Sequence, residues 1–131
     1  METNKLYALA DRHGITVDRY ALNECVSVSA QYGGKQFIAL NEGITNADER
    51  VCLAHELGHC VTLSFYNIYS PFDVREKHER RANVWAIKKL VPKKRLESEI
   101  RKGYDNPFLL SERFDVTVDF MTKALKYYNK I

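Results

Sequence analysis

Two histidines and a glutamate lie close together in the segment His55-Glu56-Leu57-Gly58-His59, which matches the pattern H-E-x-x-H. In a helix, residues i and i+4 share one face, so both imidazoles can bind one zinc ion while the glutamate lies beside it. Zinc lowers the pKa of a bound water molecule and polarises a carbonyl group. The pattern therefore predicts a zinc site on His55 and His59, with Glu56 as the general base of a hydrolytic reaction.

The residues around this motif are typical of a buried helix. Segment 46–63 carries apolar side chains on most of its surface, and it opens with Asn46 followed by Glu49 three residues later, the arrangement of a capping box. Ionisable side chains in such a helix are costly unless they are paired or bound to a metal. The setting therefore favours a helix over 46–63 and a metal-binding role for its histidines.

A hydrolytic zinc site usually takes a third protein ligand, and the next helical segment offers Glu76, His78 and Glu79. Glu79 has Asn83 at i+4 on the same face, so the carboxylate can bind metal while the amide oxygen accepts the ring N–H of a ligand histidine. Glu76 faces Arg80, a spacing typical of a solvated surface pair. Glu79 is the predicted third ligand with Asn83 as its neighbour, and His78 is the alternative ligand.

Other side chains are weaker candidates for the site. Cys52 lies at i−3 from the first histidine and approaches the metal face, although a buried free cysteine is common in any core. The oxyanion of a peptidase reaction needs a second stabilising group, for which Tyr66, Tyr69 and Tyr104 are candidates. Each tyrosine is equally typical of a packing residue.

The HELGH segment, together with the stretches before and after it, resembles the ImmA/IrrE metallopeptidases. The similarity covers 35–92 and includes a short strand-like run at 37–41 and, within 79–92, a glutamate, an Ala-Asn pair, an aromatic-Ala pair and a Leu-x-Pro-like ending. One departure is Arg81, since many members place an acidic residue directly before the Ala-Asn pair. The resemblance implies a zincin-like domain, a Zn²⁺ cofactor and a small zinc-dependent endopeptidase of phages, integrative elements or stress responses.

The partner that this resemblance implies is a helix-turn-helix transcriptional repressor, which the enzyme cleaves to relieve repression. The alternative is a zincin-like anti-repressor that binds the repressor and displaces it without cutting. Two imidazoles and a carboxylate accept several first-row divalent ions, so the sequence does not determine the metal beyond that class.

Hydrophobic periodicity and turn residues predict an α+β fold. At 131 residues, with 45% hydrophobic and 28% charged residues, the chain fits a single domain over 1–131. A first helix is expected over 4–12, then a β-hairpin that turns at Gly33-Gly34 beside the HELGH helix, and further helices over 93–102, 107–114 and 118–128. The hairpin edge could bind an extended substrate or simply cover the core.

Charge and the distribution of apolar residues limit the possible partners and location. The net charge is +3. The basic clusters Arg80-Arg81, Lys88-Lys89 and Lys93-Lys94-Arg95 are typical of solvated helix faces, so no direct contact with nucleic acid is expected. No apolar run reaches the length of a membrane span, and the first residues lack the apolar core of a signal peptide. With an odd number of cysteines, Cys25, Cys52 and Cys60, these features predict a cytoplasmic protein.

Overall fold

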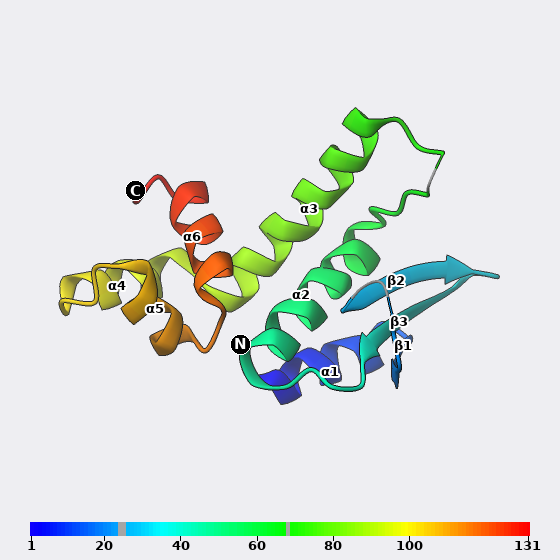
Figure 1. The fold of residues 1–131 in the computed structure, drawn as a ribbon, viewed down its shortest axis with the longest axis horizontal. Helices are drawn as coiled ribbons and strands as arrows, with labels where there is room; N and C mark the ends of the chain where they lie inside the picture. Colours follow the sequence, from blue (N-terminus) through cyan, green and yellow to red (C-terminus); the bar gives the residue numbers. More distant parts are fainter. Residues whose placement is uncertain (24–25, 68) are drawn as a thin grey trace.

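A computed structural model describes residues 1–23, 26–67 and 69–131. The described residues form six α-helices and one three-stranded sheet, with the sheet at the N-terminal end of the chain (Figure 1). The predicted α+β class is therefore confirmed. In chain order the elements are α1 (Thr3–Arg12), β1 (Ile15–Tyr20), β2 (Ser27–Tyr32), β3 (Lys35–Asn41), α2 (Asn46–Thr62), α3 (Phe72–Leu90), α4 (Lys93–Arg101), α5 (Pro107–Phe114) and α6 (Val118–Tyr127).

The sheet has the order β1-β3-β2, so the last strand in the chain lies in the middle. The predicted hairpin is present: β2 and β3 are antiparallel and turn at Gly33 and Gly34, whose φ angles of +60° and +77° suit residues without a Cβ. β1 pairs with β3 in parallel and was not predicted. It is largely exposed, with Ile15 as its buried residue, so the hydrophobic pattern that marks a strand is weak.

The start of α2 differs from the predicted capping box. Thr45 precedes the helix in an extended conformation without a side-chain capping hydrogen bond, and Asn46 has a φ of +53°. The Glu49 carboxylate instead accepts hydrogen bonds from the Tyr7 hydroxyl and from the Arg19 guanidinium, each at 2.6 Å. Glu49 therefore ties α1 and β1 to the first turn of α2, and the capping-box prediction was wrong.

α2 lies between the sheet and α3 and packs against both (Figure 1). Leu53, Ala54 and Leu57 on this helix are fully buried. At Gly58 the backbones of α2 and α3 approach so closely that an added Cβ would lie 2.6 Å from the carbonyl oxygen of Ala82. α2 can therefore lie directly on α3 because Gly58, the fourth residue of the HELGH motif, has no side chain.

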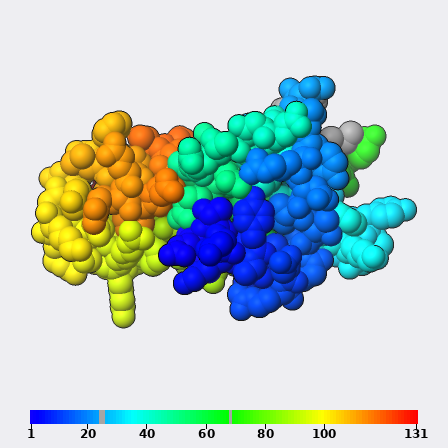
Figure 2. Space-filling model, turned by 90° about the horizontal axis from the view of Figure 1, so that it is seen from below, coloured from blue at the N-terminus to red at the C-terminus, as the bar shows by residue number. Residues whose placement is uncertain are grey.

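The C-terminal helices α4, α5 and α6 lie at the end of the molecule opposite the sheet (Figure 1), and α1 lies between the two ends on the face that Figure 2 shows. The buried Arg50 joins these parts, because its guanidinium donates to the carbonyls of Asp115 at 2.9 Å and Phe114 at 3.4 Å and to the Thr3 hydroxyl at 3.3 Å. Among the described helices, none has the length and apolar character needed to cross a bilayer.

Candidate metal centre

α2 and α3 bring three potential metal ligands to one point. His55 Nε2 lies 2.9 Å from Glu79 Oε2, His59 Nε2 lies 3.1 Å from Glu79 Oε1, and the two Nε2 atoms are 3.2 Å apart. His59 is buried, whereas His55 and Glu79 are half-buried. The three groups therefore converge at the edge of the core, with one side open to solvent.

The other ring nitrogen of each histidine is held by an oxygen acceptor. Asn83 Oδ1 lies 2.8 Å from His55 Nδ1, and the backbone carbonyl of Ser64 contacts His59 Nδ1. A neutral imidazole that donates its Nδ1 proton to an oxygen would have its Nε2 lone pair available for a metal ion. Asn83 was predicted from helical spacing. The Ser64 carbonyl was not, because it depends on the left-handed turn at Leu63 that ends α2, with a φ of +55°.

The donor set fits a zinc ion. Zn–N and Zn–O bonds of about 2.0–2.2 Å place neighbouring ligand atoms of a tetrahedron roughly 3.3 Å apart. The distances between the potential ligand atoms of His55, His59 and Glu79 run from 2.9 to 3.2 Å, close to that value. Two imidazoles and one carboxylate leave the fourth position of such a site for water or substrate. This cluster could therefore hold zinc or a similar divalent ion.

The same contacts keep the carboxylate ionised. Hydrogen bonds from His55 and His59 hold the pKa of Glu79 well below its usual range, against the opposing effect of burial. For His59, burial lowers the pKa, but the hydrogen bonds to Glu79 and to the Ser64 carbonyl outweigh it and raise the pKa. Glu79 is thus an anion over the neutral range, as a metal ligand must be.

Glu56 lies beside this cluster and is held by a residue from the sheet. Its carboxylate is buried, with 6% of the residue exposed, and Oε2 accepts a hydrogen bond of 2.7 Å from the Ser27 hydroxyl. Glu56, Ser27, His59 and Glu79 all line one cavity of about 190 Å³ between α2, β2 and the chain after α2. Ser27 was not predicted as a site residue, because a serine in a half-exposed strand gives no signal of its own.

Among the three candidate tyrosines, Tyr66 lies at the cluster. Its hydroxyl donates a 2.6 Å hydrogen bond to Glu79 Oε1. That bond, together with burial, raises the pKa of Tyr66 to about 12, so its hydroxyl keeps its proton near neutrality. Tyr69 is 87% exposed, and Tyr104 packs under the Arg113 guanidinium, 4.6 Å from the ring centroid, away from the site.

The rival ligands do not join the cluster. His78 stacks on Tyr66 with ring centroids 6.4 Å apart, and its Nδ1 finds no hydrogen-bond partner among the described residues. Cys52 lies half-buried to one side, and burial raises the pKa of its thiol, which disfavours the thiolate that binds zinc. Glu76 is exposed, and Cys25 lies outside the described residues.

A comparison with known protein families identifies the family of this chain. The profile of the IrrE N-terminal-like domain, Peptidase_M78, matches residues 10–126 and so contains every residue of this centre. No curated protein matches the chain. The match confirms the resemblance to ImmA/IrrE proteins and indicates a metallopeptidase type of domain. The chain therefore belongs to the IrrE N-terminal-like family.

Proposed function

We propose that this protein is a zinc-dependent endopeptidase whose metal ligands are His55, His59 and Glu79. The observation that carries the proposal is the buried Glu56 carboxylate, which lines the same cavity as two of these converging ligands. A buried carboxylate next to such a cluster has little structural value unless it serves a reacting group. The match to Peptidase_M78 supports the same reaction class.

The reaction follows from the roles that these side chains can take. A bound zinc ion would supply a Lewis acid and an acidified water. Glu56 would accept the proton of the attacking water and later deliver it to the leaving amine. Ser27 occupies Oε2 of this carboxylate, which fixes its orientation. Tyr66, neutral near pH 7, would exchange its bond to Glu79 for one to the developing oxyanion.

β2 is the candidate surface for binding the polypeptide. In the described sheet it pairs with β3 on one side, and Ser27, Val28 and Ser29 of β2 line the cavity that contains Glu56. An extended chain added beside β2 would pair with its backbone and place a peptide bond next to the carboxylate. This supports the substrate-binding interpretation of the hairpin over a purely structural one.

The substrate that we propose is a helix-turn-helix repressor, which the resemblance to ImmA/IrrE proteins implies. The test uses a purified candidate repressor incubated with zinc-loaded protein, with Glu56→Gln as the control that should keep its metal. We expect mass spectrometry to find cleavage with the unmodified protein and none with the variant. Repressor released from DNA equally well by both proteins, without cleavage, would instead establish a non-cleaving anti-repressor.

A further inference from the structure

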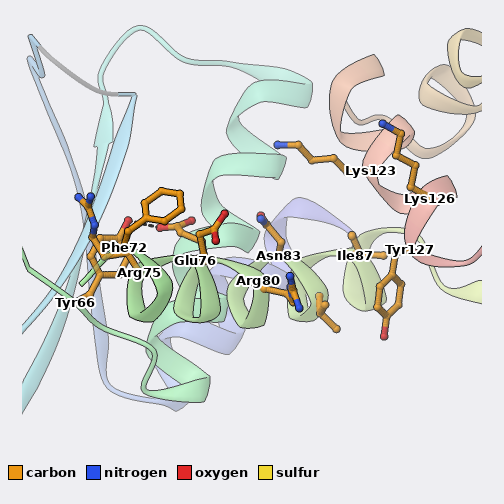
Figure 3. A pocket seen from close by; sticks show the side chains of 12 residues that line it. Tyr66, Phe72, Arg75, Glu76, Arg80, Asn83, Ile87, Lys123, Lys126 and Tyr127 are labelled. Carbon is orange, nitrogen blue, oxygen red and sulfur yellow. Dashed lines mark hydrogen bonds between the residues drawn. The ribbon is translucent and has the colours of Figure 1, made fainter. Parts of the chain in front are cut away.

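A second cavity extends away from the metal centre. It has a volume of about 840 Å³ and runs along α3 to α6 (Figure 3). Tyr66 and Phe72 lie at one end and Lys126 and Tyr127 at the other, and Glu79 also lines the cavity. Because Glu79 is also a proposed metal ligand, this groove includes the position next to the proposed scissile bond. A polypeptide bound for cleavage has to continue from that point in some direction.

The groove carries an excess of positive charge. Arg75 and Arg80 line it from α3, and Lys123 and Lys126 line it from α6, against Glu76 and the proposed ligand Glu79. In the part of the chain that the structure describes, Arg75, Arg80 and Lys126 form no ion pair.

The fourth cation has only a surface partner. Lys123 Nζ lies 3.4 Å from a carboxylate oxygen of the exposed Asp119. Such a solvated pair contributes little and is easily replaced by another anion. The cations of the groove are therefore available to pair with the acidic groups of a ligand.

Apolar side chains lie between these cations. Phe72 and Tyr127 are 67% and 42% exposed, at opposite ends of the groove, and Val84 and Ile87 lie between them along α3. Exposed aromatic rings beside cations are features of a surface that binds a partner with both apolar and acidic side chains.

The groove is continuous with the surface on the other side of the site. Glu79, Asn83 and Lys123 also line a further cavity of about 310 Å³, which includes His55 and Thr117. Glu79 therefore lies where the two depressions meet, and His55 lines the second of them. A bound chain can pass over the ligands and place its next residues in the basic groove.

We propose that the groove along α3 binds an acidic, partly apolar segment of the protein substrate on one side of the scissile bond. This inference rests on the proposed endopeptidase function and names the sequence character that the enzyme selects. Charge complementarity favours Asp and Glu side chains opposite Arg75, Arg80 and Lys126. The position of the groove, which includes a proposed ligand of a peptidase centre, favours a polypeptide over a nucleic acid.

Binding tests this inference separately from cleavage. The probes are two fluorescein-labelled peptides, one alternating Glu with Leu and the other alternating Gln with Leu, titrated by anisotropy into the full-length, zinc-loaded Glu56→Gln protein. We expect the Glu peptide to bind about tenfold more tightly at low salt, as a few exposed ion pairs would provide. Added salt should reduce this difference.

Charge-reversal variants test whether the Glu peptide binds in the groove along α3. The double variant Arg80→Glu with Lys126→Glu should abolish or invert the preference for the Glu peptide. The double variant Lys94→Glu with Arg101→Glu makes the same change in net charge on the exposed surface of α4 and should retain it. The milder Arg80→Gln with Lys126→Gln, which removes charge without reversing it, should give an intermediate loss and guards against misfolding of the first variant.

Three results would overturn the proposal: equal binding of the two peptides, an equal loss in the α4 control, or single-stranded DNA that displaces the Glu peptide and binds more tightly. The last result would make the groove a nucleic-acid site. Cleavage of peptides without a preference for acidic residues, together with equal binding, would reject the groove and leave the endopeptidase function standing. Selective binding of the Glu peptide, with no cleavage of any peptide or repressor by the unmodified zinc-loaded protein, would reject the endopeptidase and leave an acidic-peptide site.

Discussion

Gly58→Ala is the substitution that probes most directly how the fold builds the metal centre. A Cβ at this position would lie 2.6 Å from the carbonyl oxygen and 2.9 Å from the Cα of Ala82, whereas ordinary contact begins at about 3.4 Å. Both atoms belong to the backbone of α3, so they cannot rotate away. The two helices must separate by a substantial fraction of an ångström.

Two opposing terms set the change in stability. Alanine favours the helix over glycine by about 1 kcal/mol. Inserting a methyl group into a packed interface costs about 1–3 kcal/mol. The free energy of unfolding should therefore fall by up to about 2 kcal/mol. Calorimetry of the zinc-free protein measures this term without a contribution from the metal.

Gly58→Ala should also weaken zinc binding. His55 and His59 lie on α2 and Glu79 lies on α3, with ligand atoms 2.9 to 3.1 Å apart across the crossing. Coordination distances tolerate shifts of only about 0.2 Å. Zinc affinity in Gly58→Ala, measured by competition with a chromophoric chelator, should therefore fall at least about tenfold, comparable with loss of a group that orients a ligand.

Two controls separate the clash from helix propensity. Ser98→Ala, in the middle of α4, gives a helix-favouring change without a close approach and should leave zinc affinity unchanged. Ala82→Gly added to Gly58→Ala should not restore zinc affinity, because the clash is with the backbone of residue 82. The reasoning is refuted if Gly58→Ala is more stable than the unmodified protein and binds zinc equally well.

Three further substitutions test individual contacts. Ser27→Ala should lower kcat about tenfold with zinc content and KM unchanged, since a hydrogen bond to the charged Glu56 is lost, and Ser27→Thr should restore part of it. Asn83→Ala should weaken zinc binding about 10- to 100-fold, measured by chelator competition. Tyr66→Phe should reduce kcat about 100-fold while the protein still binds zinc; an unchanged kcat would remove this hydroxyl from the mechanism.

Helical spacing was the part of the sequence that carried the most structural information. A period of 3.6 residues placed His55 and His59 on one face and paired Glu79 with Asn83, and the structure brings these four side chains together. Whether they bind metal remains a prediction, as does the single domain over 1–131. The helices after α3 were predicted to within one residue at each end, because Gly, Asn and Pro punctuate them.

What the sequence did not reveal depends on contacts between distant segments. β1 pairs with a strand that does not follow it directly, and its exposed surface hides the strand pattern. Ser27 contacts Glu56 across 29 positions, and the Ser64 carbonyl contacts a histidine through a turn. The predicted capping box is absent, and Glu49 instead accepts hydrogen bonds from Tyr7 and Arg19. A local sequence pattern cannot show when a tertiary contact will replace a local one.

The most direct test of the central claim is the metal content of the purified full-length protein by elemental analysis, with Glu79→Ala and the matched control Glu76→Ala one turn away on the exposed surface of α3. We predict about one zinc per chain in the unmodified protein and in Glu76→Ala, and loss of that zinc in Glu79→Ala. Absence of metal from the unmodified protein after zinc reconstitution, or full zinc content in Glu79→Ala, would contradict the proposed centre.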